Sequence, residues 1–277
     1  MDIVIVGAQK AGTTWLFSML SQQPRVGSAF AKEIHYFDNI YNSAFKFKNY
    51  KKMIMKRRSS ISFNNPRLNK YIDYATNSKD VFTDQWYKNI FLMKSANRKK
   101  MDRGLQLCFI DASPSYMTMP EKAVAHMARV LPDIEPILII RDPIKRMVSG
   151  VCGKIRRELG RQTVTTVTDV WLTRVINEGQ IPRGRYSTAI PLFRKYFRNI
   201  QIIPFGRIPA DPSGLLNEIE KKYDLDRINY KNLEGKRNAR SDKYNLNDTV
   251  LSHIERVCEV EYEYLRVEFG SDFLNQI

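Results

Sequence analysis

The apolar residues of the chain form two kinds of pattern that alternate along the sequence. Short, mainly apolar runs predict buried strands of a parallel sheet; they are Ile3–Val6, Arg25–Phe30, Leu105–Ile110, Pro136–Ile140 and Asn199–Phe205. Apolar residues three or four apart predict helices between them, at 15–20, within 71–97, and at Pro120–Leu131, Pro143–Glu158, Arg161–Asn177, Tyr186–Phe197, Pro212–Tyr223 and Asn247–Phe269. The alternation predicts an α/β fold: a P-loop-like, doubly wound parallel sheet flanked by helices, with residues 1–277 in a single domain.

The first predicted strand leads into a glycine turn and then a helix, an order that can build an anion-binding site. Gly7 ends the strand, and Gly12, Thr13 and Thr14 open the helix. Backbone N–H groups at such a helix start point toward one spot, and the helix dipole favours negative charge there. The alternative is that the two glycines only shape a tight turn.

The spacing of this turn differs from the nucleotide-binding P-loop at one position. The P-loop pattern is Gly, four residues, Gly, Lys, then Ser or Thr, and its lysine reaches the β and γ phosphates of ATP. Here Thr13 stands at the lysine position, and the only lysine of the turn is Lys10. The turn is therefore predicted to bind a phosphate group, but not ATP.

The charge of the chain favours anionic partners. Lys and Arg total 45 against 29 Asp and Glu, which gives a net charge of +16 and a pI near 9.7. Nucleic acid, an acidic polysaccharide, a phosphorylated cofactor and an anionic membrane surface all fit such a balance. No nucleic-acid-binding motif is recognised, so we expect no nucleic-acid partner.

Cysteine usage and hydropathy favour a cytoplasmic protein. Cys108, Cys152 and Cys258 lie far apart without metal-ligand spacing, which predicts buried free thiols and a reducing compartment. The sequence enters its first strand at Asp2 without a signal-peptide pattern, and no stretch approaches the roughly 20 apolar residues of a membrane helix. We expect no integral membrane segment, and the oligomeric state is not indicated.

Three segments carry a resemblance to sulfotransferases that use 3′-phosphoadenosine 5′-phosphosulfate (PAPS). Gly7-Ala-Gln-Lys-Ala-Gly-Thr-Thr14 resembles their 5′-phosphosulfate loop. Lys32-Glu-Ile-His-Tyr-Phe-Asp38 resembles the Lys-Glu-Pro-His-Phe-Phe-Asp block of the heparan-type carbohydrate sulfotransferases. Ile139-Ile-Arg-Asp-Pro-Ile-Lys-Arg-Met-Val-Ser149 resembles the family's 3′-phosphate segment. The resemblance extends from Met1 to about Phe273 and implies PAPS as the sulfuryl donor, with adenosine 3′,5′-bisphosphate as product. Because carbohydrate-type members of animals are usually Golgi membrane proteins, the resemblance implies either a soluble, bacterial-like member or an excised catalytic domain.

The cofactor contacts that the resemblance implies come from three places. Those of the loop are Lys10, Ala11, Gly12, Thr13, Thr14 and Trp15. Lys10 would lie near the oxygen that bridges phosphate and sulfate, where negative charge grows as the bond breaks; a solvated loop lysine is the alternative.

Arg141 and Ser149 match the family's 3′-phosphate ligands, and a guanidinium fork suits a terminal phosphate. Arg146 either assists them or faces solvent. Lys236 and Arg237 lie in a basic segment where carbohydrate sulfotransferases have a Lys-Gly-Arg loop over the cofactor, but the residue order here is Gly-Lys-Arg. An ordinary basic surface loop is equally consistent with that order.

The resemblance assigns the catalytic chemistry to the block after the second predicted strand. Glu33 takes the role of general base, Lys32 contacts the sulfuryl group or the substrate, and His35 supports them. A base for a hydroxyl works best with a raised pKa, which burial of Glu33 beneath the acceptor could provide. The alternatives are a surface Lys–Glu ion pair and a structural histidine. Ile34 replaces the usual proline, which leaves the shape of this loop open.

The expected reaction moves a sulfuryl group from PAPS to a hydroxyl or amine of a carbohydrate, glycolipid or small-molecule acceptor, and it requires no metal. The basic and aromatic segment around residues 41–58 either contacts the acceptor or forms a solvated helix face. One alternative is a P-loop kinase that uses ATP and Mg²⁺, with Asp111 as the acid beside the metal. The other is a non-catalytic protein that binds polyanions through its positive charge.

Overall fold

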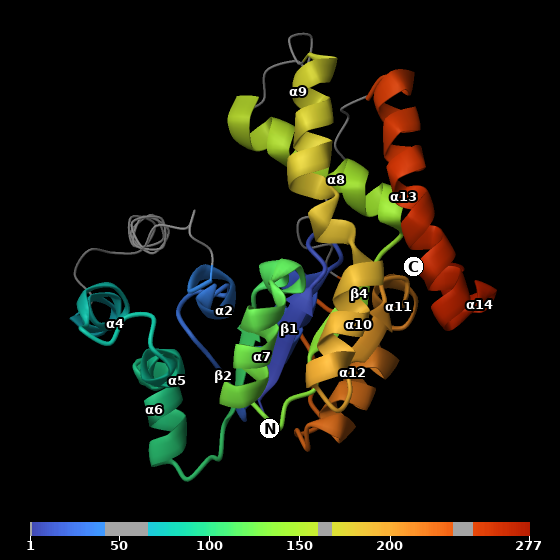
Figure 1. Cartoon of the computed structure of the whole chain (residues 1–277). Helices are drawn as coiled ribbons and strands as arrows, with labels where there is room; N and C mark the ends of the chain where they lie inside the picture. The colour runs from blue at the N-terminus through green and yellow to red at the C-terminus, as the bar shows by residue number, and fades with distance from the viewer. Residues whose placement is uncertain (1, 42–65, 160–167, 235–245) are drawn as a thin grey trace.

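A five-stranded parallel sheet forms the centre of the molecule. The computed structural model describes residues 2–41, 66–159, 168–234 and 246–277. The strands are β1 (Ile3–Gly7), β2 (Val26–Ser28), β3 (Cys108–Ala112), β4 (Ile137–Ile140) and β5 (Gln201–Pro204). They lie in the order β2-β3-β1-β4-β5, and every neighbouring pair is parallel (Figure 1). The predicted doubly wound sheet is confirmed.

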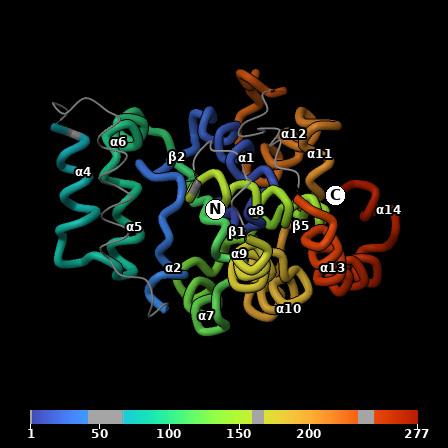
Figure 2. Tube along the Cα trace, turned by 90° about the horizontal axis from the view of Figure 1, so that it is seen from above, coloured from blue at the N-terminus to red at the C-terminus, as the bar shows by residue number. Residues whose placement is uncertain are grey.

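Two layers of helices cover the faces of this sheet. In Figure 2, α1 (Thr13–Leu20), α11 (Arg207–Ala210) and α12 (Pro212–Lys222) lie on one side of the strands, and α7 (Glu121–Val130) and α10 (Tyr186–Tyr196) lie on the other. The four residues of β4 are fully buried, as expected for a strand covered on both faces. The apolar sides of α1, α7, α10 and α12 supply most of the remaining core.

Two further groups of helices lie beyond the sheet (Figure 1). On the β2 side are α2 (Tyr36–Asn39), α4 (Pro66–Asn77), α5 (Asp84–Leu92) and α6 (Ser95–Asp102). Above the sheet in Figure 1, α8 (Pro143–Leu159), α9 (Asp169–Arg174) and the upper part of α13 (Asp248–Phe269) pack on a second apolar core, and the short α14 (Ser271–Leu274) follows α13. The described residues also form the 3₁₀ helices η1 (Pro114–Thr118) and η3 (Pro182–Gly184) and the π-helix η2 (Val175–Gln180).

Several predicted elements differ from the observed ones. Residues 71–97 contain parts of three helices, α4, α5 and α6, where one or two were expected, and β3 begins at Cys108 instead of Leu105. β3 extends to Ala112 instead of ending at Ile110, because the Asp111 side chain finds buried hydrogen-bond partners and can remain in the strand. The helix predicted over Arg161–Asn177 is observed as α9 and η2, and residues 160–167 lie outside the described part of the chain.

Cysteines and helix hydropathy agree with the predictions at residue level. Cys108, Cys152 and Cys258 are buried, free thiols. Among the described residues, no helix combines the length and apolar character needed to cross a membrane.

The carboxyl ends of the parallel strands all meet at one edge of the sheet. The segments that leave this edge are residues 7–12 after β1, 29–35 after β2, Ser113 after β3, Arg141 after β4 and Phe205 after β5. Ligand sites of open parallel sheets form at this edge. The fold therefore brings the three motif segments of the sequence together.

Candidate active site

The turn between β1 and α1 has a backbone shape that depends on glycine. Gly12 is the N-cap of α1 with φ of 86°, in the left-handed region that only glycine enters without strain. A Cβ at this position would lie 2.5 Å from Cδ1 of Ile208 and 3.3 Å from the Phe205 ring. Gly12 therefore allows both the turn and the close approach of the segment after β5.

Lys10 extends from this turn along α8. A Cβ at Gly153 would lie 2.6 Å from Nζ of Lys10, so the lysine side chain rests on the helix where it has no side chain. Burial lowers the pKa of Lys10, and the positive charges of Arg156 and Arg157 lower it further. The ammonium group therefore lies in a strongly positive environment that an anion would relieve.

Arg141 holds the same turn from the end of β4. Its Nη1 donates a hydrogen bond of 2.8 Å to the backbone oxygen of Lys10, and its guanidinium lies 4.9 Å from the centroid of the Phe205 ring. The Tyr186 hydroxyl fixes the Arg141 backbone by donating to its carbonyl oxygen at 3.0 Å. Burial lowers the pKa of Arg141. The predicted 3′-phosphate ligand thus lies beside the predicted phosphosulfate loop.

Ser149 lies on the face of α8 that contacts the turn. It is half-buried and precedes Gly153 by four residues, so the two positions share one face of the helix. Because Gly153 contacts Lys10, this face is directed toward the loop. Of the other loop residues, Ala11, Thr13 and Trp15 are buried, and the Trp15 indole donates to the backbone oxygen of Leu233 at 3.0 Å.

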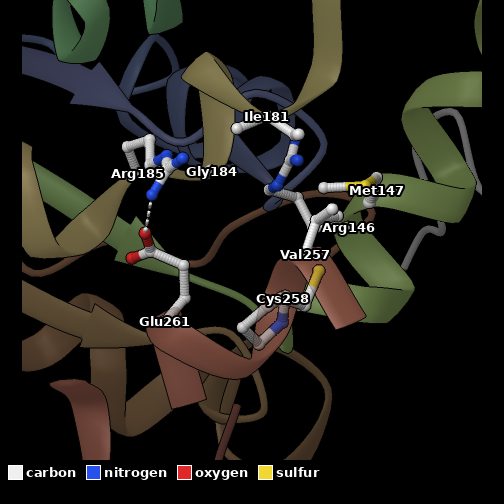
Figure 3. Close-up of a pocket in the computed structure, with 9 residues that line it drawn as sticks. Arg146, Met147, Ile181, Gly184, Arg185, Val257, Cys258 and Glu261 are labelled. Atoms are coloured by element: carbon white, nitrogen blue, oxygen red, sulfur yellow. Dashed lines mark ion pairs between the residues drawn. The ribbon is translucent and has the colours of Figure 1, made fainter. Parts of the chain in front are cut away.

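Arg146 neither faces solvent nor reaches the loop. Its side chain is fully buried, and Nη2 donates to the backbone oxygen of Gln180 at 2.8 Å. A Cβ on Gly184 would lie 2.8 Å from the guanidinium. Figure 3 shows the small pocket where Arg146 and Gly184 meet residues of α13. Arg146 therefore holds the end of η2 and the η3 helix in place. The sequence had suggested that it either assists the 3′-phosphate ligands or faces solvent.

The second predicted group is a chain of alternating charges after β2. Lys32 Nζ lies 3.1 Å from Oε1 of Glu33, and Oε2 of Glu33 lies 3.2 Å from Nε2 of His35. On the other side of the imidazole, Nδ1 lies 2.8 Å from Oδ2 of Asp38. The Ser115 hydroxyl donates to the same Asp38 oxygen at 2.6 Å. The histidine therefore links two carboxylates and fixes the orientation of Glu33.

Without a bound acceptor, the pKa of Glu33 is lowered. Burial does oppose its charge, but the hydrogen bond from His35 and the charges of Lys32 and His35 outweigh burial and lower the pKa to about 2. For His35 burial acts against the charged form, and the hydrogen bonds and charges of Asp38 and Glu33 outweigh it and raise the pKa to about 10. At neutral pH the cluster therefore holds an ionised Glu33 beside an imidazolium.

A buried hydroxyl shapes the backbone of this block. Ser113 Oγ accepts hydrogen bonds from the N–H groups of Ile34 at 3.0 Å and His35 at 3.2 Å, and it donates to Oδ1 of Asp111 at 2.7 Å. The N–H of Ile34 is a donor that proline lacks. Isoleucine at this position therefore gives the loop a backbone hydrogen bond that proline could not form. This bond and that of His35 hold the loop against Ser113.

Asp111 is a structural residue rather than an acid beside a metal. It is 1% exposed, and its other oxygen accepts from the hydroxyls of Tyr116 at 2.8 Å and Tyr87 at 3.3 Å. Burial raises its pKa to about 6. These contacts correct the role that the kinase alternative gave it.

Arg183 is a site residue that the sequence did not reveal. It lies in η3, and its Nη1 donates to Oε1 of Gln9, in the loop, at 2.6 Å. Burial lowers its pKa, the charge of Arg157 adds to that effect, and the charge of Glu33 opposes it. Arg183 thus contacts the loop and lies close enough to Glu33 for the two charges to interact. No local motif could have identified it, because 174 residues separate it from Gln9.

Some predicted contacts fall outside the described residues. These are the cofactor candidates Lys236 and Arg237 and the basic residues of 46–58 considered for acceptor contact.

Comparison with known proteins agrees with the fold and the motifs. A family model described as "Sulfotransferase family" matches residues 2–228. A sulfotransferase from Alicyclobacillus acidocaldarius has a similar structure, with a TM-score of 0.63 and 17% identity over 96% of this chain and 94% of that chain. The sulfotransferase STF9 from Mycobacterium avium gives a TM-score of 0.51 and 14% identity over 97% of this chain and 76% of that chain. A search of the curated proteins finds no match. Because the family model covers most of its length, the chain belongs to the Sulfotransferase family.

Proposed function

We propose that this sulfotransferase uses PAPS and moves its sulfuryl group to a hydroxyl or amine of a carbohydrate-like acceptor. One observation carries the proposal. Lys10, Arg141 and Arg183 gather at the turn after β1, and within the described part of the chain none of them has a carboxylate within 4.0 Å. Cations that are half-buried without a counter-charge favour an anionic ligand.

The residues of the turn fit the phosphates of PAPS. Arg141 Nε is buried and has no hydrogen-bond partner among the described residues, so a donor remains for a ligand. A buried donor without an acceptor is costly, and an oxygen atom of a phosphate would satisfy it. Arg141 and Ser149 would hold the 3′-phosphate, and residues 10–15 would hold the 5′-phosphate at the start of α1. When bound, PAPS supplies the sulfuryl group and adenosine 3′,5′-bisphosphate as leaving group.

Lys10 and Glu33 would act at the two ends of the transfer. The ammonium of Lys10 stabilises negative charge on the leaving phosphate oxygen. The carboxylate of Glu33 accepts the proton of the acceptor hydroxyl or amine. His35, Asp38 and Ser115 hold that carboxylate in one orientation.

Lys32 explains how a carboxylate with a lowered pKa could still act as the base. Its Nζ now contacts Glu33 Oε1 at 3.1 Å, and its charge is one of the causes that lower the pKa of Glu33. A contact between Lys32 and the sulfuryl group would draw this charge away from Glu33. The pKa of Glu33 would then rise when the substrates are in place.

The resemblance of residues 32–38 to the carbohydrate enzymes supports a sugar acceptor. The test is a panel of sugars, glycolipids, lipids and small hydroxylated or amino compounds incubated with the protein and ³⁵S-labelled PAPS. We expect labelled sulfate on a sugar hydroxyl or amine. Labelling of lipids or small metabolites alone would reject the carbohydrate class, and labelling of none of the compounds would reject the transfer.

A further inference from the structure

The segment that carries Arg183 contacts both halves of the candidate site. Arg183 reaches the loop through its 2.6 Å hydrogen bond to Gln9, the residue next to Lys10. η3 itself packs against η1, where Ser115 donates to Asp38 and lies 2.9 Å from Nδ1 of His35. The segment of Arg183 therefore contacts the loop on one side and the turn that holds His35 and Asp38 on the other.

Arg183 forms no ion pair with the described residues, and the charge of Glu33 acts on it only from beyond 4.0 Å. Its one hydrogen-bond partner in the described part of the chain is the neutral amide of Gln9, and no described carboxylate lies within 4.0 Å of it. Arg157 adds a second positive charge nearby. A guanidinium has five donors, and the Gln9 oxygen occupies only one of them. The remaining donors can serve an anionic group.

Contacts with α8 and α13 hold the backbone on both sides of Arg183 in place. Arg146 donates to the Gln180 carbonyl oxygen at 2.8 Å, and its guanidinium lies against Gly184 so closely that any side chain there would collide with it. Arg185 forms an ion pair of 3.8 Å with the buried Glu261 of α13, which Figure 3 shows as a dashed line. Such support preorganises the Arg183 side chain, and a preorganised donor loses little free energy when charge develops nearby.

We propose that Arg183 is a catalytic residue that donates hydrogen bonds to the sulfuryl oxygens during transfer. This inference rests on the proposed use of PAPS. In the step, the bond from sulfur to the leaving phosphate oxygen breaks, and its electron pair stays with the bisphosphate. A bond from sulfur to the acceptor oxygen or nitrogen forms, and Glu33 takes the acceptor proton. Arg183 stays chemically unchanged, and its donors follow the three sulfuryl oxygens from the loop toward Glu33.

The test compares the binding of PAPS, which has the sulfuryl group, with that of adenosine 3′,5′-bisphosphate, which lacks it. Calorimetric titration of Arg183→Ala is expected to show about tenfold weaker binding of PAPS, as for the loss of a charge-assisted hydrogen bond. Binding of the bisphosphate should change by less than about twofold, because Arg183 touches only the sulfuryl end. Arg183→Lys should give an intermediate loss for PAPS. Arg174→Ala is the matched control, since it removes an exposed arginine whose ion pair with Glu178 lies on the surface.

The transfer rate gives a second readout in the same variants. With an acceptor that the wild type sulfates, Arg183→Ala should lower kcat by about 10²–10³-fold, and free guanidinium ion in the assay should restore part of it. Equal loss of affinity for PAPS and bisphosphate would make Arg183 an ordinary cofactor ligand and overturn the proposal. An unchanged PAPS affinity with unchanged kcat would also overturn it. If the wild type binds neither nucleotide, the proposed function itself fails and this inference fails with it.

Discussion

The two halves of the candidate site handle charge in opposite ways. Around the turn after β1, Lys10, Arg141 and Arg183 lie close together, and none of them forms an ion pair of 4.0 Å or less with a carboxylate of the described residues. After β2, the charges of residues 32–38 alternate and satisfy one another through contacts of 2.8–3.2 Å. The first half is arranged to receive charge from a ligand, and the second is assembled before any ligand arrives.

This difference indicates how the work is divided. An unpaired group of cations gains stabilisation only when an anion binds, so its residues should control nucleotide affinity. A closed network of paired charges should control the orientation of the base and the stability of the loop, with little effect on nucleotide affinity. Substitutions on the two sides should therefore separate binding from transfer.

Glu33→Gln should have the largest effect of the substitutions outside η3. The amide keeps the shape of the side chain but cannot accept the acceptor proton, so kcat should fall by about 10²–10⁴-fold. Affinity for adenosine 3′,5′-bisphosphate should stay within about twofold, because the cation side is untouched. Steady-state assays with labelled PAPS and calorimetry measure the two quantities. Glu178→Gln, at an exposed ion pair, serves as control; equal turnover by wild type and Glu33→Gln would remove Glu33 from its role.

Arg141→Ala should show the converse pattern. The variant loses a buried charged donor beside the loop, so bisphosphate affinity should fall by about tenfold to a hundredfold. With saturating PAPS, kcat should fall much less than in Glu33→Gln. Titration followed by kinetics at saturation separates these effects. A variant that binds the bisphosphate as tightly as the wild type would contradict the assignment of Arg141 to the phosphate.

Ser113→Ala should disturb the loop of residues 33–35 without removing a charged group. It leaves the N–H groups of Ile34 and His35 without their acceptor and removes a donor from Asp111. Such a loss should lower the free energy of unfolding by about 1–3 kcal/mol, as urea denaturation measures. Thr118→Ala, which removes an exposed hydroxyl of η1, should have a smaller effect. Equal stability of Ser113→Ala and wild type would show that the hydroxyl does not hold the loop.

The His35 cluster should give a smaller, pH-dependent contribution to stability. The pKa of His35 is raised from 6.5 to about 10, so its contribution is complete below pH 6.5 and is lost as the pH rises through 10. The pKa of Glu33 is lowered from 4.5 to about 2, so its contribution is present above pH 4.5 and is lost as the pH falls through 2. The stability difference between wild type and His35→Gln should therefore be largest near pH 5–6 and shrink toward pH 10. Urea denaturation across this range measures it, and a constant difference would reject the imidazolium.

The strands and most helices around the sheet could be predicted from the sequence because they depend on local patterns of apolar residues. The buried strand at Ile137–Ile140 and the proline-led helix at Pro143 follow from apolar runs and helix-start residues. The meeting of the loop with Arg141 was predictable as well, since parallel strands end at one edge of the sheet.

The missed features depend on contacts between distant parts of the chain. Arg183 belongs to the site through Gln9, and Ser113 through two backbone N–H groups of another strand connection. The lowered pKa of Glu33 in the absence of an acceptor could not be predicted from the sequence for the same kind of reason. Burial raises this pKa, but His35 and Lys32 lower it more strongly. The position of His35 beside Glu33 depends on the hydrogen bonds that Ser113 accepts from the backbone of residues 34 and 35.

Calorimetric titration of the wild type with two nucleotides tests the central claim most directly, namely that the turn after β1 binds the adenosine bisphosphate of PAPS. One ligand is adenosine 3′,5′-bisphosphate, and the other is ATP with Mg²⁺. We predict tighter binding of the bisphosphate, with the same affinity when EDTA replaces Mg²⁺. Tighter binding of ATP that depends on Mg²⁺ would contradict the claim.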